Sequence, residues 1–487
     1  MKNISSFCLR KTKRNAIATL ILAGVSCQSL ADINTLNTTM NLAQKGLSVN
    51  GNAAATALTI DRQDPYTLSG GTFRVGAAFE YGNLDDIFEL YNKLAKNFKP
   101  SGDDGNNGGG NGGGDDQVDW DEIFEKYPEL EDQLNALKNE AVSMVSLFAL
   151  ISSEGYAKAE FDMEMSFVLQ DDFLGGTWMV GNDLQAYSKA VGIFEDIDFD
   201  IEKAEEALKA LIELEETDPL QEIDLTGGLV LFYDPATGKA KLKVDNDSLL
   251  LVKTALVNKF NVSYSRKAFE NEHGSLYWGA KPTLYYVGLS NVSVSIGDIT
   301  DSEKIFNDIR NADYHYTNAL DLDLGVMWAS KNYQIGASLN NVVESSYEFP
   351  QIDRSKLKSL EVASKLLHHE SFVMERQLKL EGAWYTEDRS WSVNMDIDVN
   401  KIHDPMKDEY QWASISGTYN SENWWLPSAR LGYSRNLVGS KLHYINAGVT
   451  FAKYVNLDIA TTLNTVTLND TKLMRGLNIN LGFQFDY

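Results

Sequence analysis

The C-terminal segment Leu477-Asn478-Ile479-Asn480-Leu481-Gly482-Phe483-Gln484-Phe485-Asp486-Tyr487 decides the fold class. Every second residue from Leu477 to Tyr487 is apolar or aromatic, and the residues between them are Asn, Gly, Gln and Asp. A strand that crosses a bilayer as part of a barrel alternates in this way over about ten residues, because one face meets lipid and the other meets a polar lumen. The segment therefore predicts a transmembrane strand, and the alternative is the last amphipathic strand of a soluble β-sandwich.

The same two-residue period recurs upstream. Apolar residues from Leu320 to Trp328 alternate with Asp321, Asp323 and Gly325, and the pattern resumes after a short turn at 330–332. A second pair turns at 387–389 and returns over 391–400 with Asp396 and Asp398 on its polar face. We expect these four aspartates to face the lumen. They predict a polar interior, or a cation-preferring channel if Lys and Arg leave them unpaired.

The whole chain is expected to be an all-β protein, a transmembrane antiparallel β-barrel. Further strands fit 73–81, 410–420, 426–436, 441–451 and 454–462. The count reaches about 16, or about 14 if the hairpin around 234–238 decorates a loop, within a range of about 12 to 16. Alternate connections are long and short, which is the asymmetry between external loops and periplasmic turns in such barrels.

Composition agrees with this fold and excludes other classes. The chain has 487 residues and a formal net charge of −26, which repels phosphate backbones and argues against nucleic acid as a partner. It carries 22 Tyr, 21 Phe and 9 Trp, an aromatic load typical of barrels with aromatic girdles. No internal run of 18 apolar residues predicts a helical span.

The first 31 residues predict a secretory signal peptide. Basic residues between Lys2 and Arg14 precede an apolar stretch over 16–25, and Ser29 and Ala31 offer small residues before a cleavage site. A lipoprotein signal ending at Cys27 is the alternative. Cleavage after Ala31 would remove both Cys8 and Cys27, which excludes disulfides and thiol chemistry from the exported chain. An exported, acidic, cysteine-free chain points to the bacterial cell outer membrane.

Several segments of the N-terminal half depart from the strand pattern. Residues 32–71 would plug the lumen or lie in the periplasm, and the barrel is expected over 72–487. Helical spacing predicts one helical insertion at 82–156 and another at 170–226. A Gly/Asn/Asp spacer at 101–117 divides the first insertion.

The sequence offers no catalytic, cofactor-binding or metal site that we can assign. The pair His368-His369 falls in an expected external loop, and neighbouring imidazoles point apart on a helix. We therefore expect no enzyme activity, no cofactor and no metal. A hydrolase assembled at the barrel rim from distant loops is the alternative.

Three segments resemble one protein family. They are Leu322 to Leu339, Trp384 to Val399, and Arg430-Leu431-Gly432-Tyr433-Ser434-Arg435-Asn436-Leu437. They are similar to the exported TraF-type conjugal transfer family, which is similar in turn to long-chain fatty acid transporter barrels with fourteen strands and an N-terminal plug. The chain has no Cys-x-x-Cys motif, so the thiol role of the thioredoxin-like bearer of the same name does not carry over.

These observations predict a non-enzymatic outer-membrane β-barrel. It would act as a conjugal-transfer-like envelope component, or as a conduit for small or hydrophobic molecules. An adhesin or partner-binding scaffold that uses the helical insertion is a further alternative. The expected partners are outer-membrane lipid and lipopolysaccharide, a small hydrophobic ligand and the barrel-assembly machinery. The assembly signal comprises Leu481, Phe483, Phe485 and Tyr487.

Overall fold

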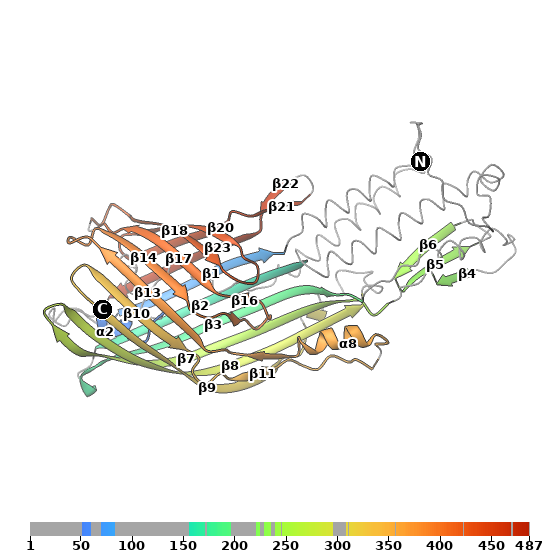
Figure 1. The fold of residues 1–487 in the computed structure, drawn as a ribbon, viewed down its shortest axis with the longest axis horizontal. Coiled ribbons are helices and arrows are strands. Elements are labelled where there is room, and N and C mark those ends of the chain that lie inside the picture. Colours follow the sequence, from blue (N-terminus) through green and yellow to red (C-terminus); the bar gives the residue numbers. More distant parts are fainter. Residues whose placement is uncertain are drawn as a thin grey trace, which may run out of the picture.

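The computed structural model describes residues 51–59, 70–82, 155–170, 173–195, 221–224, 228–234, 239–244, 246–295, 308–309, 311–355, 357–421, 423–468 and 471–486. Fourteen strands form one closed antiparallel barrel in which the last strand pairs with the first (Figure 1). The barrel strands are β1 (Gly70–Tyr81), β2 (Tyr156–Gln170), β3 (Thr177–Ile193), β7 (Leu249–Asn271), β8 (Gly274–Ser295), β9 (His315–Ala329), β10 (Tyr333–Asn340), β13 (Gln377–Tyr385), β14 (Trp391–Asp398), β17 (Trp412–Tyr419), β18 (Ser428–Asn436), β19 (His443–Phe451), β20 (Val455–Thr462) and β23 (Gly476–Asp486).

The predicted alternation is confirmed on the strands from which it was read. On β23, Ile479 and Leu481 face outward, whereas Asn478 faces inward and is 2% exposed. On β14, Val393 and Met395 are exposed, and Asn394 between them is fully buried. The barrel thus presents an apolar outside and, over much of its wall, a polar inside.

The barrel contains fourteen strands, and the hairpin around 234–238 does not join its wall. Strands β4 (Gln221–Asp224), β5 (Leu229–Asp234) and β6 (Lys239–Val244) form a separate three-stranded sheet. This agrees with the lower of the two strand counts that the sequence allowed.

The expected helical insertion at 170–226 is wrong over residues 177–193, which form barrel strand β3. The two-residue period is blurred there because Tyr187 on the inner face is apolar and buried in a cluster with residues of the loops. On the outer face, the polar residue Asn182 interrupts the apolar series and donates to Asn258 at 2.7 Å.

Other expectations fall outside the described residues. They are the signal peptide at 1–31 with Ser29 and Ala31, the spacer at 101–117, Tyr487, and most of the segments 32–71 and 82–156.

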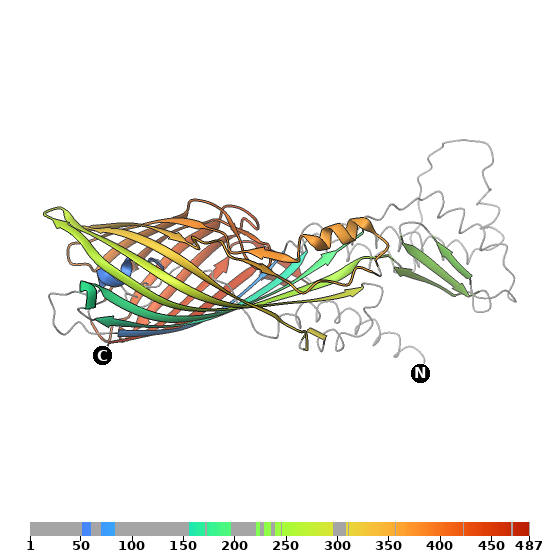
Figure 2. The same ribbon diagram turned by 90° about the horizontal axis from the view of Figure 1, so that it is seen from below.

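The two ends of the barrel differ in their connections. We call the end where β23 finishes the C-terminal end; its turns are short, as at 272–273, 330–332 and 452–454. The connections 341–376 and 399–411 leave from the opposite end. Strands β7 and β8 have 23 and 22 residues, about twice what a spanning strand needs, and they extend along the molecule toward this end (Figure 2).

The connections at the opposite end carry short elements of their own. These are β11 (Ser346–Glu348), α8 (Leu360–Leu367), β12 (Ser371–Val373), β15 (Ile402–His403), β16 (Glu409–Tyr410), β21 (Thr465–Leu468) and β22 (Thr471–Met474). Elsewhere, η3 (Phe173–Gly175) lies in the turn between β2 and β3, and α2 (Ala55–Thr59) precedes the first strand.

Candidate functional site in the barrel lumen

The lumen is partly filled by its own polar side chains. Arg430 on β18 reaches across β19 and pairs with Asp458 on β20 at 2.6 Å, with almost no exposure to solvent. A side chain at Gly448 would obstruct this pair, since its Cβ would lie 1.8 Å from Asp458 Oδ1. The glycine on the middle strand therefore lets a charged pair lie flat against the wall.

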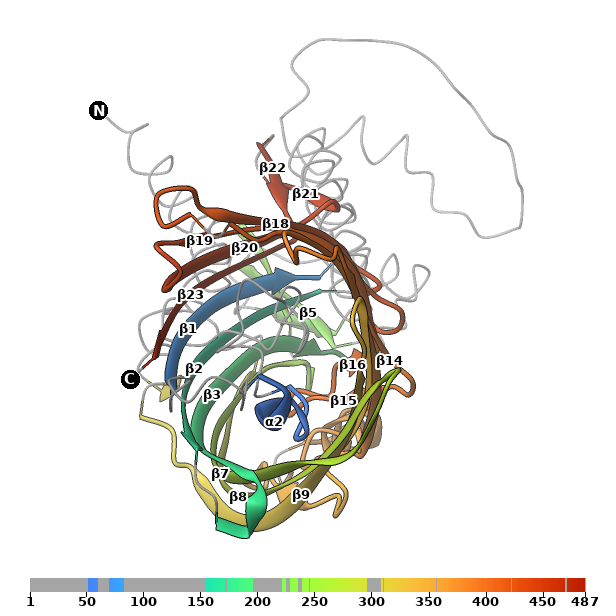
Figure 3. The same ribbon diagram turned by 90° about the vertical axis from the view of Figure 1, so that its left-hand side faces the viewer.

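The segment 52–58 lies inside the barrel near the C-terminal end, where α2 is visible within the ring of strands (Figure 3). Asn52 is fully buried and donates from Nδ2 to Glu381 at 2.5 Å, and its Oδ1 accepts the N–H of Ala54 at 2.9 Å. The N–H of Ala57 donates to Ser265 Oγ at 2.8 Å. The bonds to Glu381 and Ser265 tie the segment to wall residues that are far from it in the sequence.

Two glycines make room for that segment. Gly279 on β8 and Gly325 on β9 are cross-strand partners on the inner face. A Cβ at Gly279 would lie 2.0 Å from the carbonyl oxygen of Ala53, and one at Gly325 would lie 2.0 Å from Asn52 Oδ1. Only glycine permits the backbone of 52–54 to approach the wall so closely.

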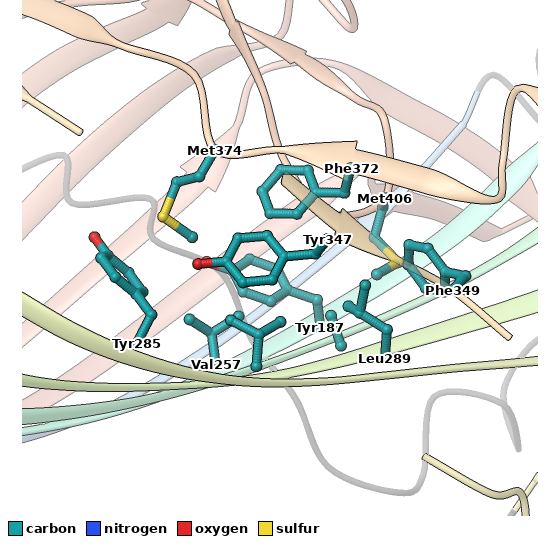
Figure 4. Packing of buried hydrophobic residues seen from close by; sticks show 11 residues of the cluster. Tyr187, Val257, Tyr285, Leu289, Tyr347, Phe349, Phe372, Met374 and Met406 are labelled. Carbon is teal, nitrogen blue, oxygen red and sulfur yellow. The ribbon is translucent and has the colours of Figure 1, made fainter. Parts of the chain in front are cut away.

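A cluster of apolar residues fills the lumen toward the opposite end. We call it the lumen cluster. The wall contributes Tyr187, Ala255, Val257, Tyr285, Val287 and Leu289; the loops contribute Tyr347, Phe349, Phe372, Met374 and Met406. Figure 4 shows the aromatic rings and methionines of the loops packed over the aliphatic side chains of the wall. The inner face of β3, β7 and β8 is thus apolar at these positions.

The insertion 341–376 is anchored at several points. Val362 and Leu366 of α8 are fully buried, and they belong to a second cluster with Leu249 and Leu251 of β7. Lys365 of α8 donates to the carbonyl oxygen of Phe194 at 2.8 Å. This insertion and the loop 399–411, whose Met406 enters the lumen cluster, together cover the lumen at the opposite end.

The four aspartates predicted to face the lumen do lie on the inner side of their strands, and two of them accept backbone N–H groups of the insertion 341–376. Asp323 accepts from Asn341 at 2.9 Å and Asp321 from Val343 at 2.9 Å. Asp398 accepts the N–H of Trp412, the first residue of β17, at 2.8 Å. Asp396 hydrogen-bonds with Ser414.

Two of these aspartates also have cationic neighbours. Asp323 pairs with Lys281 at 3.1 Å, and Asp398 lies 3.7 Å from Lys379. The geometry therefore makes Asp321 and Asp323 anchors of the insertion 341–376. Asp323 and Asp398 also have the lysine partners that a cation channel would have to lack.

Sequence reasoning missed the charged residues that hold the loop 399–411, namely Lys158, Lys189, Lys253, Asp404 and Asp408. The three lysines come from strands whose mutual register the sequence does not reveal. The only available signal is the pair of aspartates four residues apart in an expected external loop.

His369 follows α8 and lies in a positively charged environment. Burial, together with the charges of Lys253 and Lys189, lowers the pKa of His369 to about 4. It is therefore neutral at physiological pH. Within the described ranges, no group of three His, Cys, Asp or Glu residues is placed to hold a metal ion.

No helix in the part of the chain that the structure describes is long and apolar enough to cross a bilayer.

The protein family described as "F plasmid transfer operon, TraF, protein" matches residues 49–398. Among solved structures, the chain is similar to the toluene transporter TbuX of Ralstonia pickettii, with 10% identity, 91% of this chain and 94% of that chain covered, and a TM-score of 0.39. It is similar to the toluene transporter TodX of Pseudomonas putida at 11% identity, with 90% and 92% covered and a TM-score of 0.37. A TodX mutant described as a monoaromatic hydrocarbon channel gives 12% identity, 90% and 93% coverage and a TM-score of 0.40. No curated protein matches the chain.

Proposed function

This chain belongs to the family of the F plasmid transfer operon TraF protein, and from that premise we propose that it is a non-enzymatic β-barrel of the bacterial outer membrane. In this proposal it is a closed conduit for small hydrophobic molecules. The lumen cluster is the observation that carries the proposal, because an aqueous diffusion pore has no use for an apolar inner wall.

The outer surface supports a membrane location. Outward-facing residues on β14, Val393, Met395 and Ile397, are each more than two-fifths exposed. Soluble proteins rarely expose continuous apolar surface on this scale, whereas lipid covers it at little cost. Leu481, Phe483 and Phe485 continue the apolar face to the end of the barrel, which supports their proposed role as a signal to the barrel-assembly machinery.

Parts of the chain lie inside the lumen near both ends, which supports regulated passage over free diffusion. The segment 52–58 lies inside the lumen near the C-terminal end, and the insertion 341–376 and the loop 399–411 place apolar side chains in the lumen toward the opposite end. With the C-terminal end in the periplasm, the long loops would face the exterior. A hydrophobic molecule would meet the lumen cluster first.

Planar-bilayer conductance of the refolded full chain, paired with a mobility shift on heating, tests the barrel and its closure. We expect heat-modifiable insertion without steady conductance, because both closures are in place. Steady conductance of the unmodified chain would contradict the closed conduit. A chain that stays soluble without detergent would contradict the membrane location.

Uptake of the uncharged fluorescent probe N-phenylnaphthylamine by expressing cells tests the conduit itself. The double variant Val257→Thr/Val287→Thr keeps side-chain shape but places hydroxyl groups in the lumen cluster, so we expect uptake to fall several-fold. The matched control Val326→Thr/Val393→Thr makes the same change on the outer face. Equal uptake by both variants would exclude the lumen cluster as the route.

The family description also supports a link to conjugal transfer. Deleting the gene from a donor strain and measuring mating frequency tests that link separately. A normal mating frequency would remove the conjugal role and leave the conduit proposal unchanged.

A further inference from the structure

Three lysines stand side by side on the inner wall toward the opposite end of the barrel. Lys158 on β2 is the cross-strand partner of Lys189 on β3, which is the partner of Lys253 on β7. Lys158 and Lys253 are each 1% exposed. Like charges directly opposite one another repel, and they do so most strongly where water is excluded. This lysine row therefore needs anionic partners.

The loop 399–411 supplies those partners. Asp404 pairs with Lys158, and Asp408 pairs with Lys189 and also lies 3.3 Å from Lys158 Nζ. Burial alone would raise the pKa of Asp408, but Lys189 and Lys158 outweigh it and hold the pKa at about 2. The loop carboxylate is therefore a bound anion on this wall.

The wall itself offers the lysine row little compensation. Over the described ranges, the one wall carboxylate within ion-pair distance of the row is Glu160, at 2.5 Å from Lys158. Lys253 donates to the carbonyl oxygen of Pro405 at 3.2 Å, and its Nζ lies 4.1 Å from the ring centroid of Phe349. Without the loop, Lys189 and Lys253 would face the lumen with no carboxylate partner on the described wall.

The loop is built to present two acids with an apolar group between them. Asp404 Oδ1 accepts the N–H groups of Met406 at 2.9 Å and Asp408 at 2.8 Å, which closes a tight turn. Lys407 takes a positive φ of 69° in this turn. Met406 is 1% exposed and belongs to the lumen cluster, which adjoins the lysine row on the same inner face.

We propose that the lysine row is a binding site for an amphiphilic organic anion, and that Asp404, Met406 and Asp408 occupy it as an internal mimic of that ligand. The acidic group of the ligand replaces Asp408 on Lys189 and the carbonyl oxygen of Pro405 on Lys253. Its apolar part replaces Met406 in the lumen cluster. Binding and release of the loop are thus one event, and the inference rests on the proposed function because it names the class of molecule that opens the conduit.

Release of the loop is measured on the full chain in non-ionic detergent, with Met406→Cys in a Cys8→Ser/Cys27→Ser background. Octyl sulfate is the probe, and octanol is its uncharged match. We expect octyl sulfate, and not octanol, to accelerate thiol labelling of Cys at position 406 at least about 10-fold, because the loop must leave to admit the anion. Equal labelling with both compounds, or no acceleration, would overturn the proposal. Tryptic cleavage after Lys407 in the unmodified chain gives the same readout without the cysteine.

Binding is measured by calorimetry on Asp404→Asn/Asp408→Asn. Neutral side chains no longer compete for the lysines, so the apparent affinity for octyl sulfate is expected to rise about 10- to 100-fold if the loop is closed about 90 to 99% of the time. Lys189→Gln should abolish binding, while Lys331→Gln, a lysine at an exposed turn of the C-terminal end, should not. Unchanged affinity in the double aspartate variant would mean that Asp404 and Asp408 only hold the loop against the wall and do not compete with an anion, and it would overturn the proposal.

The heat-modifiable shift reports folding for each variant. These readouts use detergent-solubilised protein, so they do not depend on whether the barrel conducts molecules across a membrane. Loop release with no uptake of N-phenylnaphthylamine would keep the anion site and reject the hydrophobic conduit; uptake without anion-driven release would do the reverse.

Discussion

Gly279 and Gly325 face each other across strands β8 and β9, and the backbone at Ala53 approaches both from inside the lumen. The nearest atoms to a side chain at either position include main-chain atoms of the segment 52–54, which cannot rotate away as a side-chain tip can. The closure near the C-terminal end therefore depends on the absence of two methyl groups.

Gly279→Ala is expected to displace the segment 52–58 and leave the barrel intact. Its Cβ would lie 2.0 Å from the carbonyl oxygen of Ala53, so the segment must shift. Planar-bilayer recordings should show frequent openings that the unmodified chain lacks. Gly417→Ala is the matched control, since a Cβ at Gly417 meets nothing within 4 Å. Silent recordings from Gly279→Ala would mean that the segment does not limit conductance.

Asn52→Ala is expected to weaken the same closure by another route. It removes the hydrogen bond to Glu381 and leaves that carboxylate without this donor, a loss of about 1–3 kcal/mol. Protease protection of residues 51–59 should fall, and Glu381→Gln should restore part of it by removing the charge. If Asn52→Ala leaves protection unchanged, two other hydrogen bonds suffice to hold the segment: Ala57 N–H donates to Ser265 Oγ, and Ser263 Oγ donates to the carbonyl oxygen of Ala53.

Arg430→Met is expected to lower barrel stability by about 3–5 kcal/mol, because it removes the arginine that pairs with the buried carboxylate of Asp458. The midpoint temperature of the heat-modifiable shift measures the loss. Adding Asp458→Leu should recover most of it. The exposed pair Lys331–Glu387 provides the comparison, and Lys331→Met should leave the midpoint unchanged.

Acid should loosen the cover at the opposite end between about pH 6.5 and pH 4. The pKa of His369 is about 4 in the closed structure, below its ordinary value, so the released state takes up a proton first as pH falls. Stability is then lost across this window by at most about 1.4 kcal/mol per pH unit. Asp404 has the opposite effect. Burial raises the pKa of its carboxyl in the closed state, so as pH falls the closed state takes up this proton before the released state does.

The labelling rate of Met406→Cys with 4,4′-dithiodipyridine, scaled to a free cysteine at each pH, measures this opening. His369→Asn should remove the loss between pH 6.5 and pH 4. The same acid sensitivity in His369→Asn would assign it to other groups.

The sequence predicted the strands of the C-terminal half because each face of these strands meets a single kind of environment, lipid on one side and a polar lumen on the other. Ile479 meets lipid and Asn478 meets the lumen, so hydropathy alternates without interruption. The alternation did not predict strand β3, because its inner residue Tyr187 packs against apolar loop residues as in the core of a soluble domain. Periodicity fails wherever both faces of a strand are apolar or both are mixed.

The candidate site could not be predicted from the sequence, for a different reason. Lys158 and Asp404 are separated by 246 residues, and they meet only because strand register and loop path are both fixed. Asn52 and Glu381, which are 329 positions apart, are a second case. Local patterns place residues on a face, but they do not say which distant residue shares it.

The pairing of β1 with β23 also dictates the order of events during biogenesis. Gly71 is matched with Phe485 and Phe79 with Leu477, so the seam joins the first strand of the wall to the last. A nascent chain cannot form this seam until its final hairpin has been made. The segment 52–58 binds residues on β7 and β13, which precede that hairpin, so it can be in place before the wall seals around it. The lumen of the completed barrel is then first occupied by a segment of the chain itself, before the seam closes.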